Sequence, residues 1–107
     1  MRATVCEALE YEGYEVREAA SGADALALLA QGASDVVVFD LWMPVMDGWE
    51  LRRRLLATHP RLPVIVLSAL DLPPEKLAAL RADALVGKPF DLEVLYAAIE
   101  DVLGRPA

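Results

Sequence analysis

Two short, uninterrupted runs of β-forming apolar residues constrain the fold of this chain more than any other feature. The runs are residues 36–39 (Val-Val-Val-Phe) and 64–67 (Val-Ile-Val-Leu). Neither run alternates with polar residues, and a strand that is apolar on both faces is typical of a parallel sheet covered by helices on both sides. The segments around these runs carry apolar residues at helical spacing. The sequence therefore predicts an α/β fold in which helices alternate with the strands of a parallel sheet.

Start and stop signals define the remaining elements. Helices are expected over the N-terminal residues up to Gly13, from Ser21 to Gly32, over residues 49–57, from residue 73 past Leu80, and from Asp91 to Gly104. Serine and aspartate are typical N-cap residues, and glycine is typical of helix ends. Two more strands are expected, an edge strand over residues 14–19 and a short strand over residues 84–86. The predicted order is α-β-α-β-α-β-α-β-α, beginning with a helix.

The length and charge of the chain narrow its possible functions. Its 107 residues fit a single domain over residues 1–107. Seventeen acidic residues against ten basic ones give a formal net charge of −7. That balance argues against direct binding of nucleic acid and of anionic membranes. No apolar run approaches the roughly 20 residues that cross a bilayer.

A few individual residues allow more specific predictions about location and packing. Cys6 is the only cysteine and cannot form an internal disulfide, so a cytoplasmic location is expected. Cys6 itself is predicted to be a small buried group on a helix. Trp49 is expected to pack its helix against the core rather than to bind a ligand. The same helix is expected to carry a basic face formed by Arg52, Arg53 and Arg54.

Polar side chains follow three of the expected strands, at the edge where an open parallel sheet binds its ligands. Asp40 follows the first buried run, Ser68 the second, and Lys88 the last short strand. Each residue alone is compatible with a turn or surface role, but together they bring a carboxylate, a hydroxyl and an ammonium to one edge. A carboxylate can attack a phosphorus atom and form an acyl phosphate. Lys88 can neutralise one phosphoryl oxygen while Ser68 donates a hydrogen bond to another.

Three motifs carry a resemblance to a known family. They are residues 40–48 (Asp-Leu-Trp-Met-Pro-Val-Met-Asp-Gly), 64–69 (Val-Ile-Val-Leu-Ser-Ala) and 88–90 (Lys-Pro-Phe), with further matches at residues 13–16 and 23–26. Over essentially its whole length the sequence resembles the receiver domain of bacterial two-component response regulators. The resemblance implies an α/β, flavodoxin-like (CheY-like), doubly wound parallel sheet with strand order 2-1-3-4-5.

The resemblance also implies a role for each site residue. Asp40 is then the phosphoacceptor, Lys88 the phosphoryl-contacting lysine and Ser68 the switch hydroxyl. Leu85 stands where family members usually carry a Tyr or Phe that reports phosphorylation. Family members take the phosphoryl group from a histidine kinase or a phosphotransfer protein. They use Mg²⁺, which is held in part by the phosphoacceptor and by the backbone carbonyl at the position of Trp42.

Besides Leu85, the sequence departs from the family in two places. Receivers begin with a strand ending in an acidic pair that helps hold Mg²⁺, whereas this sequence starts within the following helix. Asp40 and one carbonyl make a poor octahedral site, so the metal site is expected to be incomplete and Mg²⁺ binding weak or absent. Arg81 stands where Gly is usual, and arginine forgoes the left-handed helix end that glycine adopts easily.

The absent strand is central in the family, so its neighbours would have unpaired backbone edges. We expect a sheet that is N-terminally truncated or rearranged. Either residues 14–19 pair directly with residues 36–39, or a second chain fills the gap, which makes a homodimer possible.

Three functions of different classes remain open from the sequence. The first is a phosphoacceptor receiver that signals through a change of its surface. The second is a pseudo-receiver that acts as a protein-interaction module without phosphorylation. The third is a small phosphatase with Asp40 as nucleophile, which would need an acidic residue two positions later, where Trp42 stands. No enzymatic activity is therefore predicted.

Overall fold

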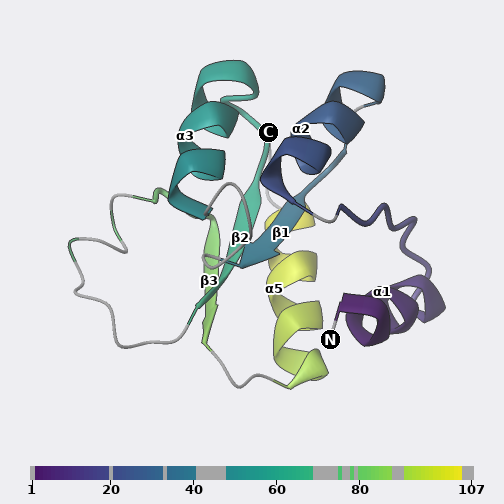
Figure 1. The fold of residues 1–107 in the computed structure, drawn as a ribbon. Coiled ribbons are helices and arrows are strands. Elements are labelled where there is room, and N and C mark those ends of the chain that lie inside the picture. The colour runs from purple at the N-terminus through teal and green to yellow at the C-terminus, as the bar shows by residue number, and fades with distance from the viewer. Residues whose placement is uncertain are drawn as a thin grey trace.

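The helices and strands of the protein form a layered α/β structure (Figure 1). The structure is a computed structural model, and it describes residues 2–19, 21–32, 34–40, 48–68, 75, 78, 80–87 and 91–104. The helices are α1 (Arg2–Tyr11), α2 (Gly22–Gln31), α3 (Gly48–Thr58) and α5 (Leu92–Leu103). The strands are β1 (Val37–Asp40), β2 (Val64–Ser68) and β3 (Ala84–Gly87). The two solid apolar runs and the short run near residue 85 thus form the strands that the sequence predicts.

The three strands form one parallel sheet with the order β1-β2-β3. Phe39 pairs with Val66 and Asp40 with Leu67 between β1 and β2. Between β2 and β3, Ser68 pairs with Gly87. The parallel α/β architecture predicted from the apolar runs is therefore confirmed for the described strands.

One face of the sheet packs against α2 and α3 (Figure 1). Its core is a cluster of buried side chains from both helices, from the sheet and from the turn before β3: Leu29, Phe39, Leu51, Leu55, Val64, Val66 and Leu80. Each fully buried aliphatic side chain stabilises the fold by about 1.5–3 kcal/mol. Trp49 packs against this cluster, as the sequence predicts.

The other face packs against α1 and α5 (Figure 1). Its cluster of buried side chains alternates along the strands with the first one: Leu9, Ile65, Val86, Leu95, Ile99 and Val102. Cys6, on α1, is half-buried rather than fully buried, and it forms no disulfide. Helices on both faces explain why the strands are apolar on both sides, since neither side is left in water.

The helix ends follow the predicted start and stop signals with one difference. Gly13 adopts a φ of +97° just after α1, a conformation that favours glycine. Ser21 caps α2 by accepting a hydrogen bond from the backbone N–H of Asp24 at 3.2 Å. Asp91 occupies the N-cap position of α5, but its side chain makes no capping hydrogen bond. Its backbone carbonyl alone accepts from the N–H groups of Val94 and Leu95.

Two further expectations concern helices. The helix predicted from residue 73 past Leu80 lies mostly outside the described residues. Among the residues that the structure does describe, no helix has both the length and the apolar character that a membrane span requires.

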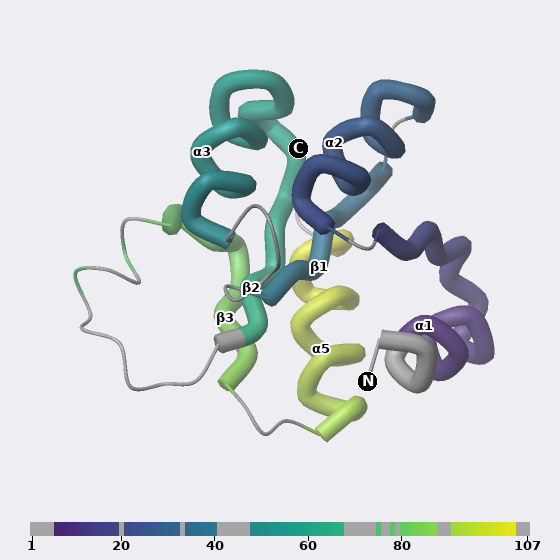
Figure 2. The backbone as a smooth tube through the Cα atoms, viewed as in Figure 1, coloured from purple at the N-terminus to yellow at the C-terminus, as the bar shows by residue number. Residues whose placement is uncertain are grey.

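The edge strand predicted over residues 14–19 is not formed, and this prediction is wrong. The segment has no strand assignment and runs from α1 to α2 on the β1 side of the sheet (Figure 2). Its side chains still alternate: Tyr14 and Val16 pack on the α1/α5 cluster, whereas Glu15 and Arg17 are exposed. Alternation decides which side chains are buried, but a strand also requires a neighbouring backbone.

Side-chain hydrogen bonds, rather than a ladder, hold this segment. The Arg17 guanidinium donates to the carbonyl of Leu28 at 2.9 Å, to the carbonyl of Gly32 at 2.7 Å and to Ser34 Oγ at 2.7 Å. Arg17 thereby satisfies carbonyls at the C-terminal end of α2, where helical partners run out. In the described part of the chain, β1 pairs with β2 and direct closure of residues 14–19 onto β1 is not seen.

Asp83, just before β3, is hydrogen-bonded to the first residue of β2 through both its backbone and its side chain. Its backbone N–H donates to the Val64 carbonyl at 2.9 Å, and the Val64 N–H donates to Asp83 Oδ2 at 2.8 Å. Val64 is fully buried, so Asp83→Ala leaves the Val64 N–H without its carboxylate acceptor. We expect a loss of about 1–3 kcal/mol in the free energy of unfolding, measured by urea denaturation. Substitution of the exposed Asp35 by Ala is the control, and an equal loss there would refute this role of Asp83.

Candidate functional site

The carboxyl ends of the described strands meet at one edge of the sheet. Asp40 is the last residue of β1, Ser68 the last of β2 and Gly87 the last of β3. The register pairs Asp40 with Leu67, and Ser68 with Gly87, so the three strands end within one residue of one another. Adjacent strands lie about 4.8 Å apart. The backbones of Asp40 and Ser68 therefore reach the same edge on neighbouring strands.

Asp40 lies on the α1/α5 side of this edge. Phe39, which precedes it, packs against α2 and α3, whereas Val38 packs on the α1/α5 cluster. Since successive side chains of a strand point to opposite faces, the Asp40 side chain shares the face of Val38. Asp40 is half-buried. The backbone of Asp40 is therefore fixed at the end of a strand, and the residue is partly accessible to solvent.

Two of the predicted site residues, Lys88 and Trp42, lie outside the described residues. Lys88 directly follows Gly87, which the register aligns with Ser68. Trp42 follows Asp40 by two positions. The backbone thus brings Asp40, Ser68 and the residue before Lys88 together, as the order of motifs and strands predicts.

Leu85 occupies the middle of β3, where it pairs with Val66. Its side chain is 41% exposed, while the next residue, Val86, is buried. An aliphatic side chain at this exposed position offers no hydroxyl and no ring for an aromatic contact.

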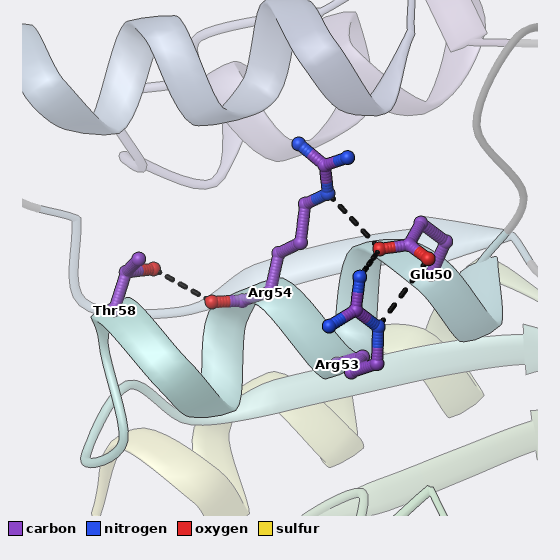
Figure 3. Close-up of polar contacts among 4 residues, drawn as sticks. All are labelled: Glu50, Arg53, Arg54 and Thr58. Atoms are coloured by element: carbon purple, nitrogen blue, oxygen red, sulfur yellow. Dashed lines mark hydrogen bonds and ion pairs between the residues drawn. The ribbon is translucent and has the colours of Figure 1, made fainter.

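The exposed part of α3 is occupied by an internal ion-pair cluster (Figure 3). Glu50 accepts from Arg53 Nε at 3.3 Å and from Arg54 Nε at 3.0 Å, and Arg53 also binds it through Nη2. Thr58 Oγ1 donates to the Arg54 carbonyl at 2.8 Å. Hydrogen bonds from Arg53, and then from Arg54, lower the pKa of the Glu50 carboxyl. These arginines are therefore partly neutralised within their own helix.

The prediction of a basic face on α3 is wrong for Arg52. Arg52 is 6% exposed and donates from Nε to the Leu80 carbonyl at 2.6 Å and from Nη2 to the Arg81 carbonyl at 2.7 Å. The signal that could have shown this is helical spacing, since Gly48, Arg52 and Leu55 share one buried stripe of α3.

A surface hollow lies at the end of the sheet where the strands begin, opposite the end that carries Asp40. It has a volume of about 450 Å³ and is lined by Leu29, Ser34, Asp35, His59, Pro60, Arg61, Leu62 and Pro63. His59 is half-buried, and its Nδ1 lies 2.8 Å from Thr58 Oγ1. Because β2 begins at Val64, this hollow belongs to the starts of the strands and is separate from the Asp40 edge.

The family of the chain is decided by a match over nearly its whole length. The family model of the response regulator receiver domain matches residues 1–100. This chain belongs to the response regulator receiver domain family. The flavodoxin-like, doubly wound α/β fold that the motifs imply is thereby confirmed.

Relatives of this receiver domain are bacterial response regulators. The response regulator MprA of Mycobacterium sp. (strain KMS) is 40% identical over 107 residues, which cover 98% of this chain and 46% of the relative. MprA of Mycobacterium leprae (strain TN) is 39% identical, with 98% and 47% covered. The receiver domain thus spans about half the length of these curated relatives.

Two solved receiver domains have a similar fold. The receiver domain of NtrX from Brucella abortus superposes with a TM-score of 0.89 at 30% identity, covering 98% of this chain and 91% of that one. The non-phosphorylated HemR receiver domain from Leptospira biflexa gives 0.85 at 31% identity, covering 98% and 88%.

The donor set described at the edge does not fit Mg²⁺, the metal that receiver domains generally bind. Mg²⁺ requires octahedral coordination by oxygen. Within the described residues, no group of three or more His, Cys, Asp or Glu side chains could hold a metal ion. Asp40, the last residue of β1, supplies one carboxylate. One carboxylate provides few of the oxygen ligands that octahedral coordination requires.

Proposed function

We propose that this receiver domain accepts a phosphoryl group on Asp40 and signals by a change of its surface. The donor would be a histidine kinase or a phosphotransfer protein in a two-component phosphorelay. The observation that carries the proposal is the sheet register, which aligns Asp40, Ser68 and the residue before Lys88 at one edge. The test is phosphoryl labelling of the wild type and of Asp40→Asn.

The proposed reaction is a transfer between two nucleophiles. A carboxylate oxygen of Asp40 attacks the phosphorus of a phosphohistidine and forms the P–O bond of an acyl phosphate. The P–N bond breaks, and the imidazole leaves with the bonding electron pair and takes up a proton. Such transfers depend mainly on positioning and on neutralisation of the phosphoryl charge. Lys88 would contact one phosphoryl oxygen, and the Ser68 hydroxyl would donate a hydrogen bond to another.

The change of surface would pass through β3. Ser68 pairs with Gly87, two residues after the exposed Leu85. A shift of Ser68 toward the phosphoryl group would therefore move a strand whose outer side chain is open to a partner. We propose a signalling module without enzymatic activity, in the cytoplasm, and with no direct contact to nucleic acid or membrane through this domain.

The sequence left a second function open, which no observation of the structure favours. A pseudo-receiver would retain the fold as an interaction module without phosphorylation. The remote third function, a small phosphatase, is disfavoured because Trp42 has no carboxyl group to act as the general acid.

Mg²⁺ titration tests the expectation that the metal site of this polypeptide is incomplete. We expect a polypeptide of these 107 residues to bind Mg²⁺ very weakly, because Asp40 is expected to have few oxygen ligands beside it. Isothermal titration of the wild type against Asp40→Asn is the measurement, and nearly identical heats are expected. Submillimolar affinity that disappears in Asp40→Asn would contradict the prediction and would require replacement ligands.

A further inference from the structure

We propose that Arg52 is a positioning residue that holds a left-handed turn at Arg81 and thereby fixes where β3 begins. The inference rests on the proposed function, because β3 leads directly to Lys88. It gives a role to a buried cation of α3 that lies away from Asp40 and is no part of the phosphoryl chemistry itself.

The turn before β3 is sterically unfavourable for its residue. Arg81 has a φ of +50°, in the left-handed region, where a side chain other than Gly, Asn or Asp is uncommon. The sequence offers no glycine here, since residues 80–83 are Leu-Arg-Ala-Asp. Some other group must therefore hold the turn in this conformation.

Arg52 supplies two of the hydrogen bonds that hold it, beside the one that the Arg81 N–H donates to the Ala78 carbonyl at 3.1 Å. Arg52 Nε donates to the Leu80 carbonyl at 2.6 Å and Arg52 Nη2 to the Arg81 carbonyl at 2.7 Å. A guanidinium binds two acceptors with fixed relative geometry, so both carbonyls of the turn are oriented at once. In Figure 1, α3 lies beside the start of β3.

The cost of burying Arg52 indicates that these bonds matter. The residue is 6% exposed, and its Nη1 is buried without a hydrogen-bond partner. Burial lowers the pKa of Arg52, while Asp83 nearby raises it. A buried cation requires hydrogen bonds or paired charges to offset its desolvation, and Arg52 finds two such bonds at this turn.

The turn controls the register of a very short strand. β3 has four residues, and Ala84 already pairs with Ile65. If β3 slipped by one residue against β2, Leu85 and Val86 would exchange their exposed and buried positions. Residue 88 would then no longer directly follow the residue that pairs with Ser68. Arg52 thus acts on the Asp40 edge through β3.

Amide hydrogen exchange of four proteins tests the proposal without any phosphoryl donor. They are the wild type, Arg52→Met, and Arg52→Met combined with Arg81→Gly or with Arg81→Gln. We expect Arg52→Met to accelerate exchange of the β3 amides about tenfold more than that of the β1 and β2 amides. Arg81→Gly should reverse much of this selective change, since glycine adopts the left-handed turn freely. Arg81→Gln removes the charge but keeps the steric cost, so it should not.

Each other outcome overturns the proposal. Uniform acceleration in all three strands would make Arg52 a general core residue, and equal rescue by Arg81→Gln would make the effect one of charge. If Arg52→Met does not fold, Arg52→Lys, which can satisfy one carbonyl well, is measured in its place with the same partners. Failure here would leave labelling of Asp40 unaffected, so the two proposals are separable.

Discussion

Asp40→Asn is expected to abolish phosphoryl incorporation into this receiver domain. Asparagine keeps the size of the side chain and the end of β1, but its amide cannot act as the nucleophile that forms an acyl phosphate. The substrate protein is this chain with a receiver-type first strand joined ahead of Met1, so that metal ligands are supplied. Radiolabelled acetyl phosphate is the donor, and the label is counted on the intact protein.

The matched control is Asp35→Asn, which changes an exposed aspartate near the starts of the strands. It should label like the wild type. Hydroxylamine should remove the label from both, as expected of an acyl phosphate. Equal labelling of Asp40→Asn and the wild type would end the assignment. Absence of label from the wild type would favour the pseudo-receiver instead.

The strands of the sheet could be predicted because their physical cause is local. Residues 64–66 are apolar on both faces and are fully buried in the structure, as a strand between two helical layers must be. The ends of the helices at Gly13 and Ser21 were likewise predictable, since a left-handed φ and a capping hydroxyl depend on single residues. Each of these signals is contained in a few neighbouring residues.

The predictions that failed depend on groups far apart in the sequence. Residues 14–19 show strand-like alternation, yet Arg17 anchors the segment to α2 and no ladder forms. Arg52 is followed by two further arginines, but its carbonyl partners lie 28 and 29 residues away. Only the fold reveals such partners. The site was predictable to the extent that it depends on strand order, which brings Asp40 and Ser68 to one edge.

The remaining large effect concerns the edge of β1 that faces away from β2. In the described part of the chain, β1 pairs with β2, and the Val37 N–H donates toward that side, to the Pro63 carbonyl at 3.1 Å. Because strand N–H groups alternate in direction, the Val38 N–H faces the other edge. Val37 and Val38 are half-buried and Phe39 is buried, so water has little access to this edge. Each buried, unpaired group costs roughly 1–3 kcal/mol, and several together rival the whole stability of a small domain.

A polypeptide of these 107 residues alone is therefore expected to form a dimer or larger species in which a second chain pairs with β1. An apolar strand edge without a backbone neighbour is a template for such pairing. Light scattering at micromolar concentration measures the mass, and hydrogen exchange at Val38 reports the edge. Protection of the Val38 amide should fall on dilution together with the mass, whereas protection of the Phe39 amide, which faces β2, should persist. A cooperative monomer with Val38 and the amides of residues 14–19 all protected would instead show that the sheet closes within one chain.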